Sequence, residues 1–158
     1  MNITDLFELQ KKVNNNINID PSLTAYKVVA RKNLELHVKM SDLANETQCY
    51  KYWIDDEPIL DHDAIFDKYI TCLNQIISLG LNNNYSDIGE IIVEESEYCL
   101  SDQFLNLYID INDQIISPSK DHYSTLVEDF LTLAISLGFS DEMILDGFKN
   151  ICKEEIAL

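Results

Sequence analysis

The sequence predicts an all-α protein, a bundle of about six helices, and three observations carry that expectation. Apolar residues recur at three- and four-residue spacings, as they do on one face of a helix. Only 4 glycines and 3 prolines occur among 158 residues, and they fall between the periodic stretches rather than inside them. No alternating pattern is long enough to require a sheet. We therefore expect one domain over residues 1–158, large enough to bury a core without disulfides or metal.

The first two expected helices differ in length. The first covers about residues 3–17 and ends before Pro21. The second runs from Ser22 to about Trp53, which makes it the longest in the chain. Because some of its apolar residues lie on neighbouring faces, we expect this helix to be buried on more than one side.

A polar connection at residues 54–61 leads to a third helix at about 62–79. Gly80 follows that helix directly and is the expected left-handed C-terminal cap. After an asparagine-rich loop, residues 86–98 are expected to form a short and very acidic helix.

Three further helices are expected in the C-terminal part. Ser101 can cap the first of them, which stops before Pro118. The next covers about 121–137 and ends at Gly138, and Ser140 can cap the last.

The charge of the chain is unusual and uneven. The net charge is −17, with −4 in residues 1–79 and −13 in residues 80–158. Such a field repels phosphate backbones, so direct nucleic-acid binding is not expected. It suits a basic protein partner, or serves solubility alone. Four cysteines without a CxxC pair, together with the absence of a signal peptide or transmembrane-length apolar run, indicate a reducing cytoplasm and no membrane contact.

Few residues offer catalytic chemistry on their spacing alone. The acidic pairs Glu94/Glu97 and Asp110/Asp113 have the spacing of one helical face, but so acidic a chain contains such pairs by chance. We interpret this quartet as a solvated face. The three histidines are isolated, and no glycine-rich phosphate loop is present.

Four segments give the chain a family resemblance: "DLFELQKKVNNNI" near the start, "DLANETQCYKYW" (42–53), "KYITCLNQIISLGL" (68–81) and "LVEDFLTLAISLGFSDEMILDGF" (126–148). In this order and over nearly the whole chain, they resemble the dimeric all-α dUTPases of bacteria and phages, which belong with the MazG-like nucleoside triphosphate pyrophosphatases. The resemblance implies a helical bundle, which agrees with the periodicity.

The resemblance also implies a metal site that has degenerated here. The family places four magnesium-binding carboxylates at positions that correspond to Lys39, Asp42, Lys68 and Thr71 of this chain. One carboxylate of four remains. We expect Lys39 and Lys68 to neutralise Asp42 and Glu46 directly, which would leave a salt-bridged site that takes no metal or other cofactor.

The aromatic segment after these positions is less altered. Tyr50, Lys51 and Trp53 match the family's aromatic-Lys-aromatic segment. They are either a nucleotide-binding wall or an aromatic cluster that packs the junction between helix and loop.

These features favour a catalytically inactive dUTPase-like protein, phage- or mobile-element-encoded, that regulates or inhibits a protein target. One alternative is an active magnesium-dependent enzyme that converts dUTP to dUMP and pyrophosphate at a rearranged site of Asp42, Glu46 and Asp67. Another is a nucleotide sensor without hydrolysis, in which Lys39 and Lys68 contact phosphate. If the chain forms a homodimer, the second and third helices are the expected seam.

Overall fold

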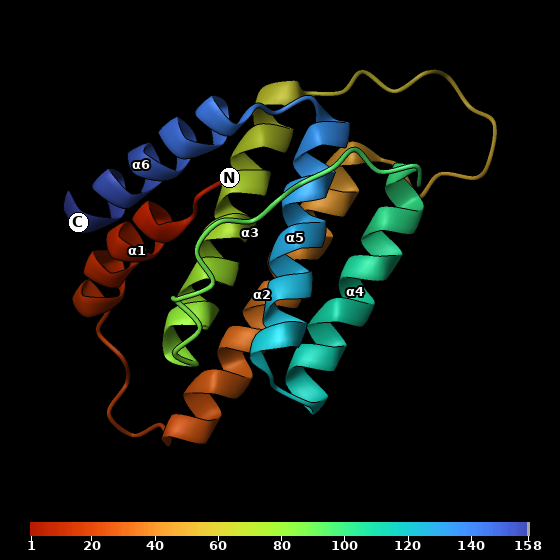
Figure 1. The fold of residues 1–158 in the computed structure, drawn as a ribbon. Coiled ribbons are helices and arrows are strands. Elements are labelled where there is room, and N and C mark those ends of the chain that lie inside the picture. Colours follow the sequence, from red (N-terminus) through yellow and green to blue (C-terminus); the bar gives the residue numbers. More distant parts are fainter. Residues whose placement is uncertain (158) are drawn as a thin grey trace.

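The computed structural model describes residues 1–157, and within that range it is helical with no β-sheet, so the predicted all-α class is confirmed (Figure 1). The helices, in chain order, are α1 (Thr4–Asn16), α2 (Ala25–Thr47), α3 (His62–Asn82), α4 (Leu100–Ile116), α5 (Lys120–Leu137) and α6 (Asp141–Ala157). None of these helices is long and apolar enough to cross a membrane.

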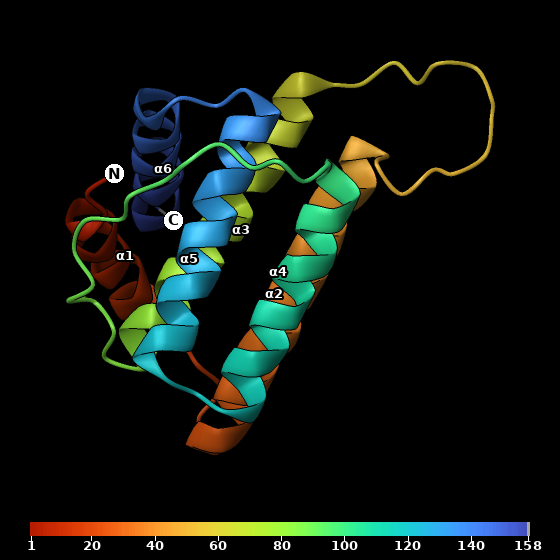
Figure 2. The ribbon, with the colours of Figure 1, turned by 45° about the vertical axis from the view of Figure 1, so that its right-hand side comes forward.

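Helix α3 is the centre of the arrangement. It packs against α2 and α5 in a group of four helices that α4 completes, and against α1 and α6 on its other side. Figures 1 and 2 show α1 and α6 together at one flank, and Figure 2 shows α4 in front of α2 at the other, where the two helices are in contact. The buried apolar residues of all six helices form one continuous core.

Two of the predicted helix boundaries are confirmed by their hydrogen bonds. Gly138 ends α5 in the left-handed conformation, with φ of 83°, and its backbone N–H bonds back into the helix. Ser140 accepts a hydrogen bond from the backbone N–H of Met143 at 3.2 Å, as an N-terminal cap does.

Helix α2 is shorter than the sequence pattern predicts. It begins after Thr24, whose hydroxyl accepts from the backbone N–H of Lys27 at 3.1 Å, and it ends at Gln48, whose φ is 53°. Residues 48–61 form a loop that extends away from the bundle in Figure 1.

The expectation that α2 is buried on more than one side was wrong for this chain. Leu36, Met40 and Leu43 are buried on one face. Four large apolar residues of α2 nevertheless remain exposed, and Leu34 and Val38 among them lie on the opposite face: Tyr26, Val29, Leu34 and Val38.

Residues 86–98, predicted as an acidic helix, instead form an extended segment that we call the strap. Its backbone pairs with the start of the chain: the N–H of Ile91 donates to the carbonyl of Met1 at 2.8 Å, and the terminal amine of Met1 donates to the carbonyl of Ile91 at 2.6 Å. The β-branched run at 91–93 favours an extended backbone, and a helix would bring the glutamates at 90, 94 and 97 onto one face. Figure 2 shows the strap crossing α5 on its way to α4.

Gly80 also differs from the prediction, because it lies inside α3 and the helix continues to Asn82. A Cβ at Gly80 would lie 2.1 Å from Oη of Tyr123. That phenol is buried and donates to the carbonyl of Ile76 at 2.9 Å. Glycine is therefore required here by the close approach of α5 to α3 rather than by a cap.

We expect Gly80→Ala to destabilise the protein by about 1–3 kcal/mol, since the added methyl overpacks a closed interface. Inside a helix without such a contact, Gly→Ala would stabilise the protein by about 1 kcal/mol. A loss of stability would therefore show that Tyr123 leaves no room for a side chain at position 80. Urea unfolding measures it. In a Tyr123→Leu background the penalty should shrink, and an unchanged penalty would assign it to another cause.

Candidate functional site

The four positions that the family resemblance assigns to a metal site lie on α2 and α3, which pack against each other. Of these four side chains, that of Lys39 on α2 makes polar contacts with two other residues. Its ammonium lies 2.9 Å from Oε1 of Glu35 and donates to Oε1 of Gln75 on α3 at 3.1 Å. Lys39 is therefore neutralised by Glu35, and the expected direct pairing with Asp42 was wrong.

The other three positions make no comparable set of contacts. Asp42 is exposed, and among residues 1–157 no ion pair includes Asp42, Glu46 or Lys68. The hydroxyl of Thr71 donates to the backbone carbonyl of Asp67 at 2.8 Å, which occupies its only proton.

These positions also face different spaces. Lys39 lines a hollow of about 290 Å³ toward α1, whereas Thr71 lines one of about 460 Å³ toward α6. Across the described residues, no three His, Cys, Asp or Glu side chains are placed to hold one metal ion. The side chains present therefore do not fit the magnesium centre that the family pattern implies.

The hollow beside Lys39 has a polar lining that the sequence reading missed, and we call it the amide pocket. Residues lining it come from α1, α2, α3 and α6: Gln10, Val13, Asn16, Ile17, Lys32, Glu35, Lys39, Asn74, Gln75, Ser78 and Glu155. Such a lining, in which amides and a hydroxyl lie among charged and apolar side chains, suits a small polar molecule.

Hydrogen bonds connect the amides behind this pocket. The amide nitrogen of Asn74 donates to Oε1 of Gln10 at 2.7 Å, and that of Gln10 donates to Oδ1 of Asn14 at 3.0 Å. Ser78 donates to the same Asn14 oxygen at 3.0 Å. The sequence did carry a signal, because Asn74, Gln75 and Ser78 are polar residues within the apolar run of α3.

One carboxylate oxygen of the amide pocket lacks a hydrogen-bond partner. Oε2 of Glu155 is buried and makes no hydrogen bond. Burial raises the pKa of Glu155, while the charge of Lys39 and the amide of Asn74 oppose that rise. Burial also lowers the pKa of Lys32 across the pocket, against the opposing charge of Glu35.

The aromatic wall is assembled, but away from the amide pocket. Tyr50 and Trp53 are tilted at a ring-centroid distance of 6.3 Å, and the ammonium of Lys51 lies 5.9 Å from the Trp53 centroid. The indole N–H of Trp53 donates to Asp55 at 3.0 Å. About half of each ring is exposed, and none of the three side chains lines the amide pocket. The cluster thus lies on the surface of the loop.

The acidic quartet is not simply a solvated face. Asp110 on α4 is half-buried, and its Oδ2 is inaccessible and without a hydrogen-bond partner. Burial raises the pKa of Asp110 to about 8, and the neighbouring carboxylates of Asp129 on α5 and Asp113 add to the rise. Glu94 and Glu97 are exposed on the strap.

We expect Asp110→Asn to change how stability depends on pH. The folded-state pKa of Asp110 lies above the unfolded value of about 3.9, so the folded state binds more protons and stability falls as pH rises from about 4 to 8. The variant should gain stability over wild type at pH 9 and lose that gain at low pH. Urea unfolding at pH 4, 6 and 9 measures this, with the exposed Asp102→Asn on the same helix as control. If the free energy of unfolding of wild type and of Asp110→Asn depended on pH in the same way, the raised pKa of Asp110 would be contradicted.

Comparison with known proteins agrees with the helical architecture. A family model described as dUTPase matches residues 2–155. The searches of curated proteins and of solved structures returned no match. The match spans nearly all of the chain, and so the protein belongs to the all-α dUTPase family, whose members are usually dimeric.

Proposed function

We propose that this chain is a non-hydrolysing member of the dUTPase family that acts by binding a protein and regulating or inhibiting it. The contact of Lys39 with Glu35 and Gln75 carries the proposal, because an ammonium group held there occupies the position of a metal-binding carboxylate. Side chains at the four family positions sum to a positive charge, which repels a divalent cation. Without a bound metal, the water that attacks the triphosphate is not activated.

Magnesium titration with a non-hydrolysable dUTP analogue, paired with a pyrophosphate-release assay, tests this proposal. We expect wild type to release no pyrophosphate and to bind no magnesium in the micromolar range.

The alternative enzyme makes the opposite prediction. Magnesium-dependent turnover by wild type that disappears in Asp42→Asn would refute the non-hydrolysing proposal. It would favour a rearranged site of Asp42, Glu46 and Asp67, of which Asp67 is exposed and lies one position before Lys68 on α3.

The amide pocket favours a second candidate, a nucleotide sensor. Its volume of about 290 Å³ and its convergent amides suit a single base, and Lys32 and Lys39 supply cations at its wall. Binding of the dUTP analogue without turnover, weakened in Asn74→Leu but not in Trp53→Leu, would support this function. Equal binding by both variants would place the nucleotide elsewhere.

We further propose that the chain dimerises through α2 and α4 rather than through the expected seam of α2 and α3. The apolar residues of α3 are buried within one chain, so α3 has no free apolar face. Helices α2 and α4 instead border an apolar hollow of about 460 Å³ that includes Tyr26, Leu34 and Ile115. Tyr108 of α4 fixes the two helices, stacking on His37 and sharing a 2.6 Å hydrogen bond with Ser41.

The dimer is tested by light scattering after gel filtration. We expect wild type to be a dimer and Tyr26→Glu/Leu34→Glu to be a monomer, because apposed copies would bury the new charges. Both side chains are more than half exposed in one chain, so the substitutions should leave its fold intact. The control Ile54→Glu/Ile59→Glu, on the exposed loop, should remain dimeric. A monomeric wild type would refute the interface.

A further inference from the structure

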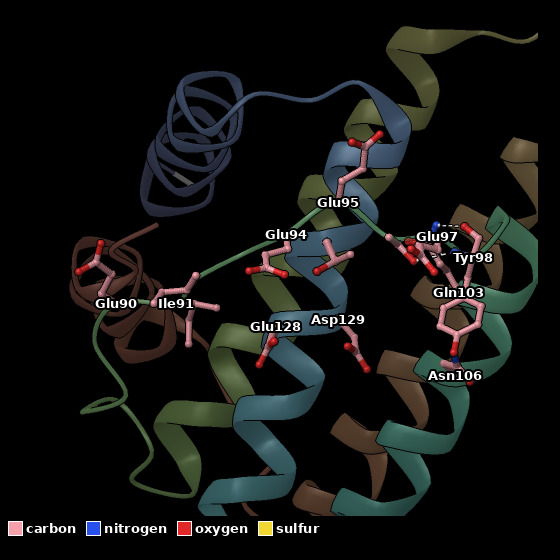
Figure 3. Close-up of a pocket in the computed structure, with 13 residues that line it drawn as sticks. Glu90, Ile91, Glu94, Glu95, Glu97, Tyr98, Gln103, Asn106, Glu128 and Asp129 are labelled. Carbon is pink, nitrogen blue, oxygen red and sulfur yellow. Dashed lines mark hydrogen bonds between the residues drawn. The ribbon is translucent and has the colours of Figure 1, made fainter.

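A further hollow lies between the strap, α4 and α5, on a different face from the positions that the family resemblance assigns to a metal site. Its volume is about 760 Å³. In Figure 3 the strap crosses α5 with Glu94 beside it and Glu128 and Asp129 on α5, while Tyr98, Gln103 and Asn106 gather where the strap meets α4. We call this space the acidic hollow.

The charge of the acidic hollow is uncompensated. Six carboxylates line it, and no lysine or arginine does: Glu90, Glu94, Glu95, Glu97, Glu128 and Asp129. None of them takes part in an ion pair within residues 1–157. A folded chain ordinarily spreads or pairs such charges, because their mutual repulsion destabilises the compact state. An external cation would remove that cost.

Gln103 supplies a second and independent observation. Its side chain lines the hollow at 7% exposure, and its Oε1 is buried without a hydrogen-bond partner. The amide nitrogen donates to the carbonyl of Tyr98 at 2.9 Å and to Ser136 at 2.9 Å. Because a carbonyl only accepts, Tyr98 fixes the orientation of this amide and leaves its oxygen as the unsatisfied atom. The carboxylates and the Gln103 oxygen are therefore all acceptors without a donor. This favours a ligand that donates hydrogen bonds.

We propose that the acidic hollow seats an arginine or lysine side chain from a basic segment of the protein partner. This inference rests on the proposed protein-binding function and names the chemistry of that partner. A metal ion fits less well, since the carboxylates are dispersed and no three are placed to coordinate one ion. Two exposed side chains beside them, Ile92 and Tyr98, offer apolar and aromatic surface to the stem and the planar face of an arginine. A free polyamine would use the carboxylates but leave these surfaces without a specific partner.

The test is a titration of the protein with a short blocked peptide of alternating Arg and Gly, labelled with fluorescein. The variant Glu94→Gln/Glu97→Gln/Glu128→Gln removes three carboxylates from the hollow. Glu8→Gln/Asp56→Asn/Glu57→Gln removes three exposed carboxylates elsewhere and gives the same net charge. We expect affinity to fall at least about tenfold in the first variant and less than about twofold in the second.

A tethered cation gives a separate measurement. Thr132 lines the hollow one helical turn after Glu128 on α5, so Thr132→Arg places a guanidinium beside that carboxylate. We expect this variant to melt at a higher temperature than wild type and to bind the peptide at least about tenfold more weakly. A lower melting temperature together with unchanged peptide binding would count against an occupant at this position.

The remaining outcomes separate this inference from the function on which it rests. Equal losses in the two triple variants, or no binding by wild type, would overturn the acidic hollow as a specific site. Spermine or magnesium binding more tightly than the peptide would assign the hollow to a free cation and overturn the protein source. Turnover of dUTP by wild type would refute the non-hydrolysing function. The peptide titration would still decide, independently, whether the acidic hollow is a specific site.

Discussion

Helix α3 is enclosed by four other helices, and every residue from Cys72 to Gly80 is buried. The contacts of α3 with α5 differ between the two ends of α3. Near its C-terminal end α5 approaches so closely that only glycine fits at position 80, with the Tyr123 phenol bonded to the α3 backbone. Nearer its start, Tyr69 stacks on Phe130 at a centroid distance of 4.4 Å and donates to its carbonyl at 2.8 Å. Two tyrosines, each with its hydroxyl satisfied, thus tie α3 to α5 along the core.

The same enclosure explains the amide pocket. A polar side chain on a fully buried helix must find a partner within the protein, because an unsatisfied group costs about 1–3 kcal/mol. Asn74 and Ser78 meet this requirement through α1, and Gln75 through α2, where it donates to the carbonyl of Lys32 at 3.0 Å and accepts from Lys39. Lys39 is therefore integrated into the packing of α2 on α3. A carboxylate at that position would repel Glu35 and lose the bond to Gln75, so this fold is adapted to the cation.

The sequence predicted what depends on local periodicity and missed what depends on distant contacts. Helix existence, the Gly138 cap and the family pattern were accessible because each is encoded within a few consecutive residues. The strap was not, since its extended form depends on pairing with Met1, which lies 90 residues away in the chain. The role of Gly80 likewise depends on Tyr123, and the partner of Lys39 was missed because Glu35 competes with Asp42 at similar helical spacing.

The amide pocket and the acidic hollow differ in how many of their polar groups find partners within the protein. Around Lys39 the ammonium is paired with Glu35 and the amides are bonded to one another, while Oε2 of Glu155 is left without a partner. In the acidic hollow the carboxylates are unpaired and Gln103 retains a free acceptor, and on the adjoining α4 Asp110 is driven toward its protonated form. Unrelieved repulsion of this kind lowers stability without contributing to the core. The gathering of unpaired carboxylates on this face is explained if the acidic hollow is the site that meets a ligand.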